Sequence, residues 1–397
     1  YRHCKDFRPD LLLTTLFGEF FASDIAEKIN TPCWRLRFSP DVPYGNDNHS
    51  TPGDIHPSFG VTSHPWVTSM TLAWQRASLG FVYWQEGVLA ELEEFRIKVL
   101  GLPPKSLREK QVESEHTPLL LAYSPTVLEL PEDTKSWQIG VGFWFLTEAS
   151  AGADGAFSRK GQMTCSFGHK LDIFIKKSIR KDGLICIDFG SCENKDLIER
   201  CIEAVSMCNT RKKRRRIIVR SDIDFHKVLS NYKKFDSKFV QFVANISHSE
   251  LFPYCTLLIH HGGAGTTAQA LRSGIPSIVI PALRLTDQSL WADRIEALGA
   301  GIYIRRDNPS STTIRQALEN LFQNYDRYKK ELKELKVTLD TESRTSLSAT
   351  VDLIESPMQN WAPELCTGSQ QCPVMHSIAR RKLKSIESNL DDICLTH

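Results

Sequence analysis

Short apolar runs alternate with stretches of helical spacing through residues 182–345. Each apolar run is bounded by Gly, Pro or polar residues, which is typical of a buried strand. The strands expected are 184–189, 216–221, 239–242, 256–260, 277–280 and 301–304, and the helices expected are 194–209, 266–273, 287–298, 312–322 and 327–339. Alternation of this kind predicts a parallel sheet that is covered by helices.

The first part of the chain shows the same alternation less regularly. The strands expected there are 10–15, 33–38, 119–123 and 137–145, with a helix at 17–30 and a long aromatic-rich helical stretch at 67–100. Residues 149–156 are rich in Gly and Ala, as linkers are, whereas residues 157–180 fit neither pattern clearly. We therefore expect two α/β domains that face a cleft. The expected division is 1–148 for the first domain, 149–181 for the linker, 182–345 for the second domain and 346–397 for a C-terminal helix and tail.

The composition narrows the class of protein. Hydrophobic residues make up 41% and charged residues 24%, which is ordinary for a globular chain. The net charge of +2 gives no reason to expect a nucleic-acid partner, and no apolar run approaches the ~18 residues that span a bilayer. The 11 cysteines are odd in number and scattered, which argues against a disulfide framework. We expect a cytoplasmic protein whose chain, opening at Tyr1 without Met, starts inside a longer polypeptide.

The most informative segment joins a strand to a helix. The apolar run that ends at His260 continues as His-Gly-Gly-Ala-Gly-Thr-Thr over residues 261–267. Small residues let a ligand approach the backbone, and a helix N-terminus presents unpaired N–H groups with a partial positive charge. Such a turn at the carboxyl end of a parallel strand suits a phosphate or diphosphate, with His260 or His261 able to donate to a phosphate oxygen. The alternative is that the glycines only make a tight turn.

Asp287 and Gln288 follow the next expected strand, 277–280, and would lie beside this turn. A carboxylate next to an amide is suited to binding neighbouring sugar hydroxyls. The alternative for Asp287 is plain capping of the helix that follows.

Together these segments resemble the donor-binding signature of nucleotide-sugar glycosyltransferases, in particular that of sterol 3-beta-glucosyltransferases. Residues 260–267, 271–276 and 287–301 are similar to the family's His-His-Gly-Gly-x-Gly-Thr-Thr block and its continuation. Residues 247–253 resemble its Pro-His-Asp-x-Leu-Phe-Pro segment, and Asp188-Phe189-Gly190-Ser191 resembles its Gly-Phe-Gly-Ser turn. Residues 26–32 and 140–146 resemble landmarks of its first domain.

The resemblance implies a glycosyltransferase-B fold, with two Rossmann-like domains facing a cleft and the first domain incomplete. It implies an inverting transfer of glucose from UDP-glucose to the 3-hydroxyl of a sterol, or a similar apolar acceptor, with no metal or other cofactor. The residues that it places near the diphosphate are Ser191, His261, Gly262, Gly263, Gly265, Thr266 and Thr267; near the glucose, Asp287 and Gln288; and near the uridine, Val243 and His248.

The chain departs from the family in two respects. The segment from Pro281 to Gln288 is two residues longer than the family's Pro-Phe-x-Gly-Asp-Gln. The family's Gly-Thr-x-Gly-Asp loop, which supplies or positions the catalytic base, is not found in this chain, so we expect the base upstream of Tyr1. The weak candidates within the chain are His3, His49, His56 and His64, of which His56 resembles an acceptor-side landmark. These departures leave two alternatives open: a non-catalytic UDP-sugar-binding protein, and a transferase acting on another lipid or apolar alcohol.

Other patterns in the sequence give weaker evidence about function. The basic run 211–216 could contact a membrane surface peripherally, but a solvated turn is the simpler interpretation. Cys366, Cys372 and His376 are too loosely spaced to predict zinc, and we interpret Asp222-Ile223-Asp224 as a polar loop. The aromatic stretch 66–95 could line an acceptor pocket or form ordinary helix core.

Overall fold

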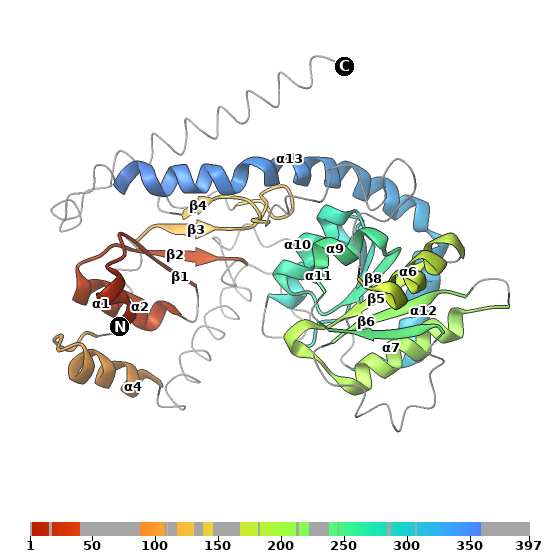
Figure 1. The fold of residues 1–397 in the computed structure, drawn as a ribbon, viewed down its shortest axis with the longest axis horizontal. Helices are drawn as coiled ribbons and strands as arrows, with labels where there is room; N and C mark the ends of the chain where they lie inside the picture. Colours follow the sequence, from red (N-terminus) through yellow and green to blue (C-terminus); the bar gives the residue numbers. More distant parts are fainter. Residues whose placement is uncertain are drawn as a thin grey trace, which may run out of the picture. The chain divides into compact units, whose positions relative to one another are not determined.

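The computed structural model describes residues 2–15, 18–39, 88–106, 109, 117–130, 138–145, 167–181, 183–211, 214–221, 238–244, 246–283, 287–305 and 308–358. The chain divides into two compact units (Figure 1). Unit 1 comprises residues 1–49, 64–145 and 342–397, and unit 2 comprises residues 50–63 and 146–341.

Unit 1 contains a four-stranded parallel sheet with strand order β1-β2-β3-β4. Its strands are β1 (Leu12–Thr14), β2 (Cys33–Arg37), β3 (Leu119–Leu121) and β4 (Gln138–Gly140), and its helical segments are α1 (Arg2–Phe7), α2 (Glu19–Ile29), α4 (Val88–Glu94) and the π-helical turn η3 (Phe95–Val99). Side chains of β2, β3 and β4 form its core with Leu353 of the long helix α13 (Tyr325–Met358). The sheet therefore has the parallel arrangement that the alternating pattern predicts.

A buried ion pair holds α2 to the η3 turn. Arg96 and Asp24 are 2% and 1% exposed, and Arg96 Nη1 lies 2.7 Å from Asp24 Oδ1. The guanidinium also binds the carboxylate of Glu27 and donates to the carbonyl oxygen of Pro103 at 2.6 Å. The pKa of Glu27 lies below its usual value, chiefly because Arg96 hydrogen-bonds its charged form. These contacts satisfy a charge that would otherwise be costly to bury.

Unit 2 contains a six-stranded sheet, again wholly parallel, with strand order β10-β9-β8-β5-β6-β7. Its strands are β5 (Leu184–Asp188), β6 (Arg216–Arg220), β7 (Val240–Val243), β8 (Leu257–His260), β9 (Ser277–Val279) and β10 (Gly301–Tyr303). Its helical segments are α6 (His169–Lys181), η4 (Gly190–Cys192), α7 (Lys195–Cys208), α9 (His248–Leu251), η6 (Phe252–Tyr254), α10 (Ala264–Ser273), α11 (Gln288–Ala297), α12 (Ser311–Gln323) and the first part of α13.

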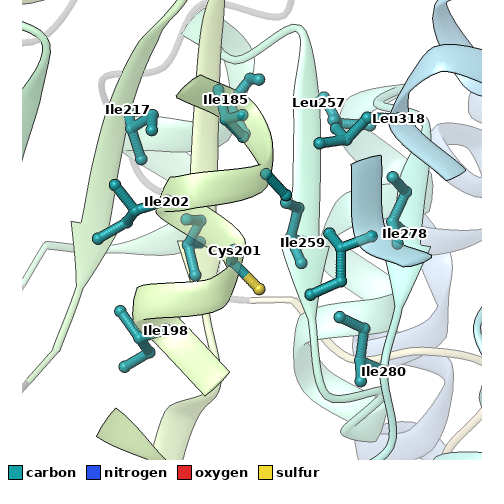
Figure 2. Packing of buried hydrophobic residues seen from close by; sticks show 14 of the residues in the cluster. Ile185, Ile198, Cys201, Ile202, Ile217, Leu257, Ile259, Ile278, Ile280 and Leu318 are labelled. Carbon is teal, nitrogen blue, oxygen red and sulfur yellow. The ribbon is translucent and has the colours of Figure 1, made fainter. Parts of the chain in front are cut away.

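Both faces of this sheet are covered, so the central strands read as continuous apolar runs. On one face, Ile185, Ile217 and Ile259 pack against α7 and α12, as Figure 2 shows for α7 residues Ile198, Cys201 and Ile202. On the other face, Leu184, Cys186, Ile218 and Leu258 pack against residues of α6, α9, η6 and α10. Local signals fix the helix ends: the side chain of Asn194 caps α7, that of Ser310 caps α12, and α10 ends at Gly274 in the left-handed conformation.

The strands and helices expected in unit 2 are confirmed, with ends that differ by a few residues. The helical segments that were not predicted are α1, α6 in the region that fitted neither pattern, the short segments η4, α9 and η6, and the continuation of α13 from Leu339 to Met358. Most of the expected linker and of the helical stretch 67–100 lies outside the described residues. Among the helices that the structure describes, none is long and apolar enough to cross a bilayer.

Candidate functional site

The strand order of unit 2 places a topological switch point beside the glycine turn. From β5 the chain proceeds outward through β6 and β7, returns to β8 on the other side of β5, and then proceeds outward through β9 and β10. The connections from β5 and β8 therefore leave in opposite directions at the carboxyl edge of the sheet. Open parallel sheets bind ligands at such a switch point. The segments that border it are Phe189–Cys192 after β5 and His261–Gly263 after β8.

Two glycines of the turn are required by the protein's own packing. Gly262 has φ +91°, and a Cβ there would lie 2.6 Å from the carbonyl oxygen of Gln288. A Cβ on Gly263 would lie 2.5 Å from Nε2 of His261. For these two positions the tight-turn interpretation is sufficient.

Gly265 is different. Its φ is outside the left-handed region, and no atom of the described residues lies within 4 Å of the place that a Cβ would occupy. It is exposed in the first turn of α10, where the N–H groups of a helix have no acceptor within the helix. The N-cap residue Gly263 offers no side chain to bind them. Nothing in the fold requires glycine at position 265, and its absent side chain leaves open space at the positive end of a helix.

The imidazole of His261 lies between the two turns that border the switch point. A Cβ on Gly190 would lie 3.2 Å from Cε1 of His261, and a Cβ on Gly263 would lie 2.5 Å from Nε2 of the same ring. The residue is 8% exposed, and Nδ1 has no hydrogen-bond partner among the described residues. Burial lowers the pKa of His261, which is therefore a neutral ring close to the first turn of α10.

His260 is placed for a structural role. It is fully buried, and its Nδ1 accepts a hydrogen bond of 3.1 Å from the N–H of Gly262. Burial lowers its pKa to about 3. Of the two histidines expected at the mouth of the turn, His260 lies inside the fold and shapes the turn, and His261 lies nearer its surface.

Both threonines of the motif are buried. Thr266 is 7% exposed and Thr267 is fully buried, and Oγ1 of Thr267 has no partner within the described part of the chain. The same is true of the buried hydroxyl of Ser289 in α11. Their expected position facing a diphosphate stays a prediction.

Asp287 and Gln288 have different surroundings. Asp287 does not cap α11 with its side chain; its Oδ2 accepts a hydrogen bond of 3.0 Å from the indole N–H of Trp291. Gln288 is 5% exposed, and its Oε1 accepts from the backbone N–H groups of Ala282 and Leu283 at 2.8 and 3.0 Å. The side-chain amide oxygen of Gln288 thus stabilises the loop that carries the two extra residues.

The same amide joins this loop to the β5 side of the switch point. Gln288 Nε2 lies 3.4 Å from Sγ of Cys192, in the η4 turn that also contains the exposed Ser191. Contact with glucose hydroxyls through Gln288 and Asp287 stays a prediction.

A buried carboxylate that the sequence did not single out completes the site. Asp188, at the end of β5, is fully buried and lies 2.5 Å from His248 Nε2 and 3.4 Å from Arg220 Nη1. Val243 is in register with Arg220 across β7 and β6, and its carbonyl oxygen accepts from the N–H of Ser221 at 2.9 Å. The structure thus brings His248 and Val243 to the same edge of the sheet as the glycine turn.

Comparisons with known proteins agree with this arrangement. A family model for the C-terminal domain of erythromycin biosynthesis protein CIII-like proteins matches residues 227–345. The chain is 32% identical to a sterol 3-beta-glucosyltransferase of Yarrowia lipolytica over 238 residues, and 30% identical to one of Komagataella phaffii over 295 residues. These alignments cover 58% and 73% of this chain but only 15% and 22% of the relatives' length.

Solved structures show the fold. The kitacinnamycin glycosyltransferase superposes with a TM-score of 0.57 at 15% identity, covering 89% of this chain and 77% of the other. The glycosyltransferase VinC, solved in complex with DTDP, superposes with a TM-score of 0.52 at 16% identity, covering 91% and 74%.

The chain has a GT-B fold. The expectation drawn from its motifs is therefore confirmed for the fold, and the similarity to sterol 3-beta-glucosyltransferases is confirmed in sequence. In this GT-B chain the glycine turn, His248 and Asp287 all belong to unit 2.

Several predicted residues lie outside the described part of this GT-B chain. These are His49, His56, His64, Asp222, Asp224, Cys366, Cys372, His376 and residues 212–213 of the basic run. Within the described residues, no group of three or more His, Cys, Asp or Glu side chains has the arrangement of a metal site.

The described residues of the basic run differ in burial: Arg211 and Arg214 are exposed, whereas Arg215 and Arg216 pack on aromatic rings. Arg215 is 7% exposed, with its guanidinium carbon 3.5 Å from the centroid of the Phe322 ring. Arg216 lies over the rings of Phe174 and Phe239. Cation–π contacts of this kind contribute to folding, so the expectation of a free solvated turn is wrong for Arg215.

Proposed function

We propose that this chain carries the activity of an inverting, UDP-glucose-dependent glucosyltransferase that acts on the 3-hydroxyl of a sterol. The sequence similarity to sterol 3-beta-glucosyltransferases supports glucosyl transfer to a sterol. The GT-B fold supports the general class, because its solved neighbours carry the name glycosyltransferase.

One observation carries the proposal: the open space at Gly265, in the first turn of α10 and beside the switch point of the sheet. A nucleoside diphosphate has the charge and shape for such a place. The buried ring of His261 adds a second, independent feature, since its Nδ1 has no partner within the described residues. The neighbour VinC was solved with a nucleoside diphosphate, DTDP, which supports the same class of ligand.

The chemistry that follows concerns the leaving group. When the bond between glucose and UDP breaks, negative charge grows on the diphosphate, and groups fixed in advance around it lower the barrier. The N–H groups of the first turn of α10 carry a partial positive charge and can donate to the phosphate oxygens, with the ring of His261 beside them. In the transfer that we propose, these groups stabilise UDP without a metal or another cofactor.

Asp287 is the residue that we propose for the sugar. Its Oδ2 is oriented by Trp291, and among the described residues no group binds its Oδ1. A carboxylate oxygen of this kind can accept from a glucose hydroxyl. We assign no residue of the described chain as the base that deprotonates the sterol hydroxyl.

The test is a transfer assay with the full-length gene product, with the 397-residue chain assayed beside it. Radiolabelled UDP-glucose is incubated with a panel of sterols, and the product is separated from the donor by extraction. Formation of a steryl glucoside that requires the 3-hydroxyl supports the proposal. Absence of UDP binding at millimolar concentration, measured by calorimetry, would overturn the assignment of the donor site.

A second function is favoured by the surroundings of Gln288. Its acceptor oxygen is already bound by two backbone N–H groups, which supports a site that holds a UDP-sugar without turning it over. Tight UDP-glucose binding together with no transfer to any acceptor by the full-length gene product would select this alternative.

We also propose that the protein is cytoplasmic and contacts membranes peripherally, because a sterol acceptor resides there. Arg215 and Arg216 are packed on aromatic rings, so they are poor candidates for this contact. Co-sedimentation with vesicles containing anionic lipid tests it, and recovery of the chain only in the supernatant would reject it.

A further inference from the structure

Asp188 is a carboxylate with a full set of donors. Its Oδ1 accepts from the N–H of Gly190 at 2.9 Å, and Arg220 Nη1 lies 3.4 and 3.5 Å from its two oxygens. Its Oδ2 lies 2.5 Å from His248 Nε2. Burial alone would raise the pKa of Asp188, but the hydrogen bond from His248, the guanidinium of Arg220 and the hydrogen bond from Gly190 oppose it, and the pKa lies below its usual value.

This carboxylate determines which nitrogen of His248 carries the proton. An ionised carboxylate can only accept hydrogen bonds, so His248 Nε2 must donate. Whenever the ring carries a single proton, that proton is on Nε2 and the other nitrogen, Nδ1, is an acceptor. No described residue binds Nδ1, and the side chain of His248 is 25% exposed.

The ring is also fixed in orientation. His248 stacks on Phe252 with ring centroids 4.7 Å apart and an angle of 29° between the ring planes. An acceptor held by stacking on one side and by a charged hydrogen bond at its far nitrogen points in one direction. Such a group can discriminate between hydrogen-bonding partners, because its own geometry does not adapt to the wrong one.

The position of His248 suits contact with the base of a bound nucleotide. Asp188 is in register with His260 across the neighbouring strands β5 and β8. Only one strand spacing, ~4.8 Å, therefore separates the carboxylate that holds His248 from the strand that leads into the glycine turn. The same carboxylate fixes Gly190, next to Ser191 on the border of the switch point. A diphosphate at Gly265 thus has His248 within the reach of its nucleoside.

We propose that Asp188 is a positioning residue that keeps His248 Nδ1 an acceptor and so makes the site prefer a nucleobase with an imino N–H. This inference rests on the proposed function. Uracil presents such an N–H at N3, and cytosine presents an unprotonated acceptor at the same position. The glycosyltransferase turn that residues 188–191 resemble has glycine in place of Asp188, so the resemblance does not imply this arrangement.

The test compares UDP with CDP, which share the ribose and the diphosphate. Calorimetry on the 397-residue chain is expected to give UDP at least tenfold tighter binding than CDP, because one ligand donates to Nδ1 and the other opposes it with a second acceptor. The informative variant is Asp188→Asn. With Oδ1 still accepting from Gly190, the amide nitrogen replaces Oδ2 and donates to His248 Nε2, which moves the ring proton to Nδ1. The UDP-to-CDP preference is then expected to fall at least tenfold.

Two controls separate positioning from folding. Asp340→Asn removes a carboxylate that pairs with Arg272 elsewhere in unit 2 and is expected to leave the preference unchanged. In a His248→Leu background, Asp188→Asn is expected to have no further effect on the ratio. Nitrogen-15 spectra of labelled histidine, assigned by loss of the His248 signal in His248→Leu, report the tautomer directly: Nε2–H in the parent and Nδ1–H in Asp188→Asn.

The outcomes are distinct. Equal affinity of the parent chain for UDP and CDP, or an equal loss of both in Asp188→Asn, overturns the inference and leaves the proposed function standing. No binding of either nucleotide overturns both. A preference for UDP that collapses in Asp188→Asn together with the tautomer change supports the inference.

Discussion

Replacement of Gly265 separates what the fold requires from what a ligand requires. Because Gly265 is outside the left-handed region and no described atom lies within 4 Å of a Cβ there, Gly265→Ala and Gly265→Leu should fold normally. Replacing glycine inside a helix stabilises it by about 0.5–1 kcal/mol, which raises the melting temperature of a unit of this size by roughly 2–4 °C. A side chain in the first turn of α10 would, however, obstruct the phosphate oxygens. Loss of one charge-assisted hydrogen bond costs about 1.5–3 kcal/mol, or ~10–150-fold in Kd for UDP.

The assay pairs thermal unfolding with UDP calorimetry on each variant. Gly262→Ala is the matched control, because φ +91° and the Gln288 carbonyl 2.6 Å from the new Cβ predict a loss of roughly 2–5 kcal/mol in stability. The two positions should therefore respond in opposite directions. Gly265→Leu with unchanged UDP affinity would refute the reasoning, since the open space would then face no ligand. A large loss of stability in Gly265→Ala would refute the premise that the fold tolerates a side chain there.

The remaining predictions concern charge. Asp287→Ala should weaken UDP-glucose binding about tenfold and leave UDP binding within about twofold in calorimetry; equal losses for both ligands would exclude the sugar contact. The pKa of His260 is lowered to about 3 in the folded chain. On acidification the unfolded chain therefore takes up this proton first, so the free energy of unfolding falls as the pH drops below ~6.5. Between pH 6.5 and 5.0 urea unfolding should show about 2 kcal/mol of loss that is absent in His260→Gln, and equal slopes in both proteins would contradict this. Arg215→Glu buries a lone charge and removes the contact with Phe322, so urea unfolding should show a loss of ~3 kcal/mol in the free energy of unfolding. The control, Arg214→Glu at an exposed position, should change this free energy by less than ~1 kcal/mol. Similar effects of the two substitutions would show that Arg215 is not buried in solution.

The strands of unit 2 could be predicted because their surroundings are uniform. A parallel strand covered on both faces needs apolar residues at every position, and Leu184–Asp188 and Leu257–His260 satisfy this up to their last residue. The turn residues that end them are equally local in origin. The order of the strands in the sheet, in contrast, depends on contacts between segments far apart in the sequence, and the pattern along the chain does not give it.

Helix α6 was missed although its signal is present. Leu171, Phe174, Ile175 and Ile179 follow helical spacing, and Phe174 and Ile175 are buried against the sheet. Ser178 interrupts the apolar stripe, but its hydroxyl donates to the carbonyl oxygen of Phe174 at 2.7 Å and so can be buried within the helix.

The continuation of α13 was hidden by the same effect on a larger scale. Its last part is rich in Ser and Thr, which are weak helix formers. Ser346 and Thr350 are buried on one face, and their hydroxyls donate to the carbonyl oxygens four residues earlier, at 2.5 and 2.6 Å. Once satisfied in this way, small hydroxyl side chains permit close packing, as where Ser346 contacts the backbone at Gly142.

The candidate site was predictable only where its chemistry is local. The glycine turn and its helix are consecutive in the sequence, so their position follows from the strand-to-helix pattern. The contact of Gln288 Nε2 with Cys192 joins residues 96 positions apart in the sequence, and no local pattern predicts it. The expected sugar contact through this amide was drawn from a likeness whose loop is two residues shorter, and that difference falls in the segment that Gln288 braces.

Asp188 did have a signal in the sequence, and it explains why the site lies where it does. Three neighbouring strands end in a titratable residue after an apolar run: β8 in His260, β5 in Asp188 and β6 in Arg220. Register pairing aligns all three in one row on the same face of the sheet. That face is apolar one pleat earlier, where Cys186, Ile218 and Leu258 pack against helices, so the row marks the line at which the helical cover ends and polar chemistry begins. Charged residues at the last position of adjacent buried strands are costly to a fold unless they pair with one another or serve a ligand. Here Asp188 pairs with Arg220, and the row borders the place where we propose that a ligand binds.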